Sequence, residues 1–153
     1  MSKYNVLLAE DDADDYSFFV EAFGRISAEY RIERAKHGLE CITYLKTHEK
    51  PDVIFLDLNM PLKSGLECLK FIKNNEALED IPVIIYSTSH YIKHIDAAFK
   101  GGAHYYIVKP NNADLLTEIL NTALSRLDES GEKPGKYNFV VRNQVTLENS
   151  PGR

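Results

Sequence analysis

Short apolar runs alternate with longer amphipathic segments along most of this 153-residue chain, and that alternation constrains the fold more than any other feature. The apolar runs are rich in Val, Ile, Leu, Phe and Tyr and end at charged or turn-forming residues, as β-strands do. We predict strands at residues 3–9, 30–36, 53–56, 82–87 and 105–108. Helical spacing of apolar residues predicts helices at residues 14–28, 39–48, 64–73, 91–100 and 112–127.

Helix-capping signals support three of these boundaries. The stretch "SGLE" at Ser64 has the form of a capping box, in which the Ser and Glu side chains bond each other's backbone amides. Either Asn111 or Asn112 can cap the last helix. The pair Gly101-Gly102 stops the helix that precedes it.

Regular alternation of strands and helices predicts βαβ units with right-handed crossovers. Such units build a parallel sheet with helices on both faces, and its strands are buried on both sides. This burial explains why the strands read as continuous apolar runs instead of alternating patterns. The expected fold class is α/β, a doubly wound five-stranded parallel sheet with helices on both faces.

Bulk composition is that of a soluble globular protein, with 44% hydrophobic and 27% charged residues. No apolar run approaches the roughly 20 residues needed to span a bilayer, and the N-terminal residues lack a secretory h-region. Cys41 and Cys68 are isolated, which predicts reduced cysteines on buried helix faces in the cytosol. The net charge of −5 argues mildly against nucleic acid as a partner. We therefore expect a cytoplasmic protein that binds neither membrane nor nucleic acid.

Beyond residue 127 the composition changes to Gly, Pro, Asn and charged residues, with one apolar patch at Phe139-Val140-Val141. We therefore divide the chain into a domain at 3–127 and a C-terminal tail at 128–153. The tail either stays mostly disordered or docks its patch on the domain, as a short strand near 138–141. It is too short for a DNA-binding domain with a core of its own.

Polar residues gather where the predicted strands end. In an open parallel sheet these carboxyl ends share one edge, and ligands bind there. The residues that the strands deliver to this edge are Glu10, Asp11, Asp57, Ser87, Thr88 and Lys109.

The chemistry of this set indicates a divalent cation and a phosphate. Clustered carboxylates repel one another and cannot all stay ionised without a cation. Oxygen donors without His or Cys favour Mg²⁺, and a lysine with a hydroxyl suits an anion that arrives with the metal. Asp57 is then placed as a nucleophile toward a phosphoryl group, forming an acyl phosphate.

Other candidate ligands have simpler interpretations. Asp12, Asp14 and Asp15 are expected to be helix-start acids, which the helix dipole favours. His90 and His94 have the four-residue spacing of a zinc pair on a helix but lack a third ligand, so we expect a solvated helix face.

Four stretches at these strand ends carry a family resemblance: "VLLAEDD", "VIFLDLNMPLKSG", "PVIIYSTS" and "GGAHYYIVKP". In this order and spacing they resemble the receiver domain of two-component response regulators, which has the CheY-like, flavodoxin-like fold. The resemblance covers about residues 3–127. It implies a stand-alone module that accepts a phosphoryl group and is not a true enzyme.

The resemblance assigns a role to each acid. Asp57 matches the phospho-acceptor. Asp11 matches a direct Mg²⁺ ligand, and Glu10 the acid that acts mainly through water. Asn59 would give its backbone carbonyl to the metal.

The resemblance also assigns the switching residues. Ser87 matches the hydroxyl that follows the phosphoryl group, and Thr88 the small-residue position beside it. Lys109 would pair with a phosphoryl oxygen, and Tyr106 matches the aromatic whose rotamer reports the state of the serine. The Lys109–Pro110 bond resembles one that is cis in the family.

The implied partners are a histidine kinase or histidine phosphotransfer protein upstream and a protein target downstream. The target would dock on the face made by the helix 91–100, the strand 105–108 and the helix 112–127. Three alternatives stay open: a phosphorelay intermediate, a pseudo-receiver that only binds partners, and a phosphatase of the haloacid dehalogenase type. The phosphatase places a second Asp where this chain has Asn59, which counts against turnover.

Overall fold

A computed structural model describes residues 4–26, 29–130 and 135–142 and shows one parallel sheet with helices on both faces. The strands are β1 Tyr4–Ala9, β2 Tyr30–Ala35, β3 Val53–Leu56, β4 Val83–Ser87 and β5 Tyr105–Val108. The α-helices are α1 Ala13–Gly24, α2 Gly38–Thr47, α3 Gly65–Lys73, α4 Ile92–Lys100 and α5 Ala113–Ser130. A short 3₁₀ helix, η1, spans Lys136–Asn138.

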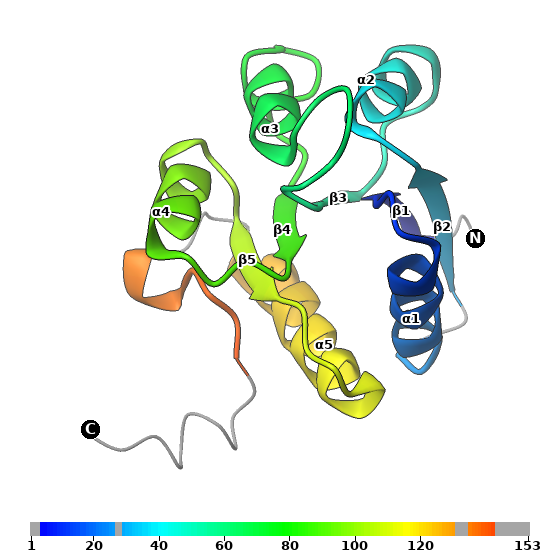
Figure 1. Cartoon of the computed structure of the whole chain (residues 1–153), viewed down its shortest axis with the longest axis vertical. Helices are drawn as coiled ribbons and strands as arrows, with labels where there is room; N and C mark the ends of the chain where they lie inside the picture. Colours follow the sequence, from blue (N-terminus) through cyan, green and yellow to red (C-terminus); the bar gives the residue numbers. More distant parts are fainter. Residues whose placement is uncertain (1–3, 27–28, 131–134, 143–153) are drawn as a thin grey trace.

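The strand order is β2-β1-β3-β4-β5, and neighbouring strands pair in parallel, so the predicted doubly wound fold is confirmed. Helices α1 and α5 cover one face of the sheet, and α2, α3 and α4 cover the other (Figure 1). The chain winds outward in both directions from β1 and β3. In open α/β sheets, ligands bind at the carboxyl ends of the strands where the strand order reverses.

Two apolar clusters hold the layers together, one on each face of the sheet. On the α1 and α5 side, the ring of Phe19 packs edge-on against Phe55 and Tyr86, with centroids 5.0 and 5.3 Å away. On the other side Cys41 and Cys68 are buried and free, as the sequence predicts. Because both faces are covered, β3 and β4 are buried along their whole length.

Helix ends follow local capping chemistry. Ser64 and Glu67 form the predicted capping box, with Glu67 N donating to Ser64 Oγ and Ser64 N to Glu67 Oε1. Asn112 is the cap of α5, because its side chain accepts from the amide of Leu115 at 3.0 Å. Helix α1 ends at Gly24 and does not reach 28 as predicted. Glycine is a poor helix former, and the next amides bond in tighter i−3 geometry; residues 27–28 lie outside the described residues.

Residues 136–142 of the C-terminal tail lie along the free edge of β5, and we name this segment the C-terminal strap (Figure 1, orange). The amide of Tyr106 donates to the carbonyl of Phe139, and the amide of Val141 donates to the carbonyl of Tyr106, both at 3.0 Å. Phe139 joins the cluster beside α4, and Val141 joins the one beside α5. The apolar patch therefore docks on the domain through an isolated bridge, beyond an α5 that continues to Ser130.

No helix in the described part of the chain combines the length and the hydropathy that a bilayer span requires.

Candidate functional site

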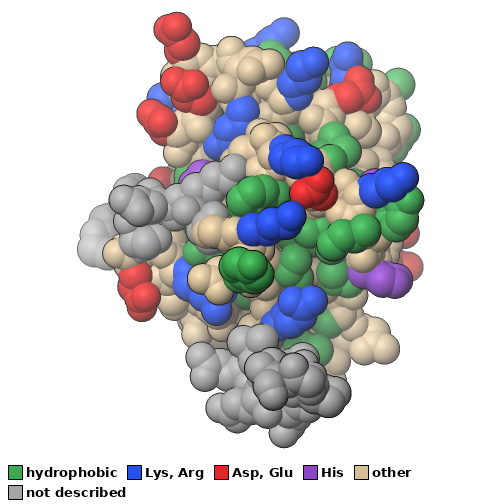
Figure 2. Space-filling model, turned by 90° about the vertical axis from the view of Figure 1, so that its left-hand side faces the viewer, with side chains coloured by type: hydrophobic (Ala, Val, Ile, Leu, Met, Phe, Trp, Pro, Cys, Tyr) green, Lys and Arg blue, Asp and Glu red, His purple; other side chains and the backbone are tan. Residues whose placement is uncertain are grey.

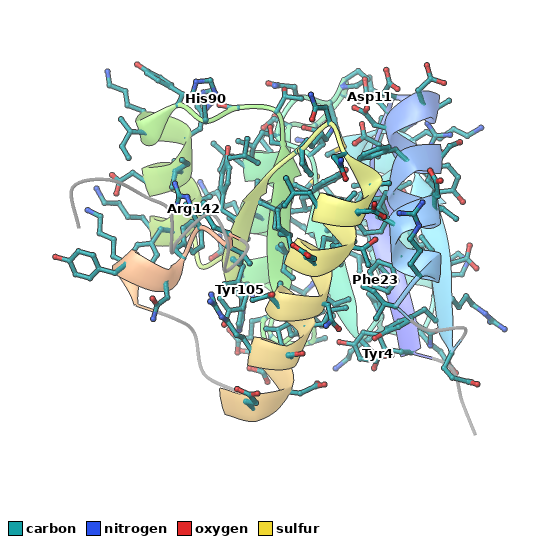
Figure 3. All side chains as sticks on the ribbon, turned by 90° about the horizontal axis from the view of Figure 1, so that it is seen from below. Tyr4, Asp11, Phe23, His90, Tyr105 and Arg142 are labelled. Atoms are coloured by element: carbon teal, nitrogen blue, oxygen red, sulfur yellow. The ribbon has the colours of Figure 1, made fainter. Side chains whose placement is uncertain are left out.

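Three carboxylates meet at the carboxyl end of the two central strands. Glu10 and Asp11 follow β1, and Asp57 follows the neighbouring β3, whose Leu56 pairs with Ala9. Each of the three acids offers an oxygen, and these oxygens lie within 4.8 Å of one another. Figure 3 shows Asp11 at this edge of the sheet, at the end opposite Tyr4.

Lys109 brings a buried positive charge to the same place. Its ammonium lies 2.7 Å from Glu10 Oε1, 2.8 Å from Asp15 Oδ2 and 2.9 Å from Asp57 Oδ2. The side chain is 7% exposed and lies over the ring of Tyr86 at 5.2 Å. The Lys109 amide bonds to the carbonyl that ends β4, which fixes the base of the side chain.

Burial and charge shift the pKa values of this group. Burial raises the pKa of Glu10 to about 7, and the charge of Asp57 adds to the rise although Lys109 opposes it. Burial alone would lower the pKa of Lys109, but its hydrogen bonds to Asp15, Glu10 and Asp57 outweigh burial and raise it. The lysine therefore stays charged, but its single positive charge is shared among the carboxylates around it and does not balance them.

Arg34 of β2 holds the backbone of the acidic turn. Its guanidinium donates to the carbonyl of Glu10 at 3.0 Å and to that of Asp11 at 3.1 Å, and it lies over the ring of Tyr16. The amide of Asp12 donates to Glu10 Oε2 at 3.2 Å. These contacts position the carboxylates without neutralising them, because the arginine bonds only to backbone oxygens here.

The loop that carries Asp57 packs closely against the first residue of α3. The amide of Asn59 donates to Asp57 Oδ1 at 3.2 Å, and the amide of Gly65 donates to the carbonyl of Leu58 at 3.0 Å. A Cβ at Gly65 would lie 2.2 Å from the carbonyl oxygen of Asp57. The first residue of α3 must therefore be glycine for the loop to pack against it.

The residues expected to switch lie at the ends of β4 and within β5. Ser87 is fully buried and Thr88 is exposed. Tyr106 points inward with 0% exposure, and its hydroxyl donates to the carbonyl of Ser89 at 2.7 Å. The amide of Ser89 donates to Ser87 Oγ at 3.2 Å, so Ser89 links the two predicted switch residues.

Ser89 also links the site to α4. Its hydroxyl lies 2.6 Å from His94 Nδ1 and accepts from the amide of Tyr91 at 3.3 Å. His90 precedes the helix, so it does not share a helix face with His94 as a zinc pair would. The helix starts at Ile92 because Ser89 holds the preceding turn.

The structure brings Glu10, Asp11, Asp57 and Lys109 together and places Ser87 beside the backbone of Lys109. For Asn59 it shows an amide contact with Asp57, and the carbonyl role stays a prediction. The Lys109–Pro110 bond is trans, as are the other peptide bonds of the described residues, so the expectation of a cis bond is wrong. Trans is the lower-energy isomer even before proline, and the lysine reaches its carboxylates from it.

Sequence reasoning missed three contributors: Asp15, Arg34 and Ser89. Asp15 was expected only to start α1, where its amide does bond to the capping Asp12 side chain. A signal for its second contact existed, since Asp15 lies in the first turn of α1, directly after the acidic residues that follow β1. Arg34 reaches the backbone of Glu10 and Asp11, and the carbonyl of Ser89 accepts from Tyr106, across distances in sequence that no local pattern shows.

The donor chemistry of the site fits Mg²⁺. Glu10, Asp11 and Asp57 are oxygen donors, which hard divalent cations prefer. Lys109 is shared among three carboxylates, so it does not balance the negative charge of the cluster. A divalent cation would supply the missing positive charge.

A doubly wound parallel sheet with an acidic cluster and a buried lysine at its switch point defines the class of CheY-like α/β proteins. The family model for the response regulator receiver domain matches residues 6–121. The chain therefore belongs to the response regulator receiver domain family and is a component of two-component signalling.

Individual relatives agree with this placement. The chain is 33% identical over 110 residues to the probable methanogenesis regulatory protein FilR2 of Methanothrix harundinacea, covering 69% of this chain and 71% of FilR2. The structure of the Mn²⁺-bound form of response regulator Rcp1 of Synechocystis has a TM-score of 0.73 at 28% identity, covering 86% and 99%. That of the phosphorylated cyanobacterial phytochrome response regulator RcpA has a TM-score of 0.77 at 28% identity, covering 88% and 100%.

Proposed function

We propose that this protein is a phosphorylation switch that accepts a phosphoryl group from a histidine kinase, or from a histidine phosphotransfer protein, on Asp57. One observation carries the proposal: the Asp57 carboxylate is nearly buried, touches the Lys109 ammonium, and lies among acids that can hold a metal. A buried carboxylate beside a lysine and a metal site can accept a phosphoryl group, because the metal and the lysine offset the negative charge of that group. The similar RcpA structure, described as phosphorylated, supports the same chemistry here.

In the transfer, an oxygen of Asp57 attacks phosphorus while the phosphorus–nitrogen bond of the donor histidine breaks. The imidazole keeps the electron pair of that bond, and the product is an acyl phosphate on Asp57. Lys109 would shift from the carboxylate to a phosphoryl oxygen, and Ser87 would donate its hydroxyl to another. The protein contributes positioning and fixed charge, with no general acid of its own at Asn59, so we propose a switch and not an enzyme with turnover.

Mg²⁺ would be held by Asp11, Asp57 and the carbonyl of Asn59, with Glu10 acting mainly through water. When bound, it neutralises charge that develops on the transferring oxygens. The excess of carboxylates over the single lysine supports a cation here. The Mn²⁺-bound form of the similar Rcp1 supports this assignment.

Switching would pass from Ser87 through Ser89 to α4. Movement of the Ser87 hydroxyl toward a phosphoryl oxygen breaks the bond that it accepts from the Ser89 amide. The carbonyl of Ser89 also accepts the Tyr106 hydroxyl, and its side chain contacts His94. A shift of Ser89 would therefore reach the first turn of α4, while Tyr106 lies inward and fills the space that Ser87 leaves.

The downstream protein would dock on α4 and the C-terminal strap. The strap takes the free edge of β5, so the expected α4–β5–α5 surface is modified there. A cleft of about 390 Å³ lies between α4 and the strap, with Ile92 and Phe99 on one side and Phe139 on the other. Lys93, Lys136 and Arg142 line the same cleft. Figure 2 shows this face, where hydrophobic side chains are interspersed with Lys and Arg.

Intact-mass spectrometry after mixing with acetyl phosphate tests the proposal. We expect a gain of one phosphoryl group that requires Mg²⁺, disappears in EDTA and is absent from Asp57→Asn. Circular dichroism of the variant should match the wild type, which separates loss of the acceptor from loss of the fold. A gain that persists in Asp57→Asn, or no gain at all, contradicts the proposal.

A further inference from the structure

Phe139 of the C-terminal strap packs against Tyr106, the residue proposed to switch. Its ring centroid lies 6.2 Å from that of Tyr106 and 5.2 Å from that of Phe99 on α4. Phe139 is 1% exposed and Tyr106 is 0% exposed. The strap therefore closes the side of the tyrosine that would otherwise face solvent at the sheet edge.

The backbone of the strap also bonds directly to the tyrosine. The amide of Tyr106 donates to the carbonyl of Phe139, and its carbonyl accepts from the amide of Val141. An edge strand usually leaves such groups to water. Here both backbone groups of the switch residue depend on whether the strap is docked.

Two contacts thus hold Tyr106 inward, one at its hydroxyl and one at its ring. The carbonyl of Ser89 accepts its hydroxyl, on the side of the phosphoryl site. Phe139 packs against the ring from the strap. Phe139 packs against both Tyr106 and Phe99, so a tyrosine that turned toward the strap would disrupt a close-packed apolar contact.

We propose that Phe139 is a positioning residue that holds Tyr106 inward, so that docking of the strap and phosphorylation of Asp57 favour the same state. The inference rests on the proposed function, in which Tyr106 lies inward when Ser87 moves toward the phosphoryl group. Two ligands that favour one state strengthen each other's binding by the same factor. The strap acts as the intramolecular ligand, and its release frees the tyrosine and weakens the bond to the phosphoryl group.

The test compares beryllofluoride binding in saturating Mg²⁺ among matched variants, followed by fluorine NMR. Beryllofluoride binds a carboxylate as a phosphoryl mimic, and its affinity is a readout that a merely structural role of Phe139 would not move. We expect Phe139→Ala to weaken the affinity about fivefold or more. Phe139→Leu keeps an apolar side chain, so its beryllofluoride affinity should lie within about twofold of that of the wild type. Tyr137→Ala should match the wild type, because Tyr137 is exposed on the same strap.

A measurement on the unmodified protein covers the case in which Phe139→Ala fails to fold. Beryllofluoride with Mg²⁺ should slow hydrogen exchange at the amides of Val141 and Tyr106, since coupling is reciprocal. Unchanged or faster exchange there overturns the inference, as does a Phe139→Ala variant that binds beryllofluoride as tightly as the wild type. If the wild type itself does not bind beryllofluoride, the proposed function fails and this inference fails with it. Binding without any dependence on the strap removes the inference alone.

Discussion

The ammonium of Lys109 lies 2.9 Å from the carboxylate of Asp57, and the same ammonium also contacts Glu10 and Asp15. Lys109, Asp57 and Glu10 directly follow β5, β3 and β1, and Asp15 lies in the first turn of α1. A single lysine therefore joins four separate parts of the chain at one sheet edge. The contact places a cation at the nucleophile before any phosphoryl group arrives. It also makes the stability of the metal-free protein depend on one side chain.

Lys109→Ala should lower the free energy of unfolding in EDTA by about 2–3 kcal/mol, because it leaves Glu10 and Asp57 buried without their cation. This loss of stability is kept small because the side chain of Asp15 is 41% exposed, so Asp15 can lose its contact with Lys109 at little cost. Mg²⁺ should then stabilise the variant more than the wild type, as it replaces the missing charge. Urea unfolding with and without Mg²⁺ measures both. Equal Mg²⁺ effects in the two proteins would argue against a metal site beside Lys109.

Asp11→Asn should remove the stabilisation by Mg²⁺ while leaving the metal-free protein folded. Asp11 is the exposed member of the acidic cluster, so its charge contributes little to the apo fold. A bound ligand stabilises by mass action, and millimolar Mg²⁺ should raise the wild-type melting temperature by about a few degrees. Asp14→Asn, an exposed acid on the first turn of α1, is the matched control and should keep the full shift. The idea is wrong if both variants respond alike to Mg²⁺ in thermal melts.

Gly65→Ala should destabilise the fold by more than about 2 kcal/mol, because the added Cβ would lie 2.2 Å from the carbonyl oxygen of Asp57. Gly24→Ala offers the opposite case: a Cβ there meets nothing within 4 Å at the end of α1. That change should stabilise by about 0.5 kcal/mol. Chemical denaturation of the two variants side by side gives the comparison. A Gly65→Ala variant as stable as the wild type would mean that the Asp57 loop can move away from α3.

Ser89→Ala should loosen the first turn of α4 without removing the acceptor site. The hydroxyl that contacts His94 and accepts from the Tyr91 amide is lost, at a cost of about 1 kcal/mol. The carbonyl that receives Tyr106 remains, so the inward tyrosine should persist. Hydrogen exchange should rise at residues 92–95, while labelling by acetyl phosphate stays at the wild-type level. No change in α4 exchange would show that Ser89 does not connect the site to the helix.

Local patterns predicted much of this protein. The apolar runs and helical spacings located the strands and helices. Burial of one or two faces of an element requires apolar residues at a regular spacing, and this spacing is visible in the sequence. Parallel strands end at a common edge, so Glu10, Asp57 and Lys109 could be expected to meet once a parallel sheet was expected. The capping box at Ser64 was likewise readable, since its two bonds join residues three apart.

Other features depended on contacts between distant residues. The sequence alone determined the fold class and the set of polar side chains at the sheet edge, because these follow from periodicity and chain order. Only the tertiary structure decided that Asp15 contacts Lys109, that the Lys109–Pro110 bond is trans, and that Phe139 packs against Tyr106. Each of these depends on whether close packing brings separate elements together. Such packing energies sum over many neighbours, so a short window of sequence does not contain them.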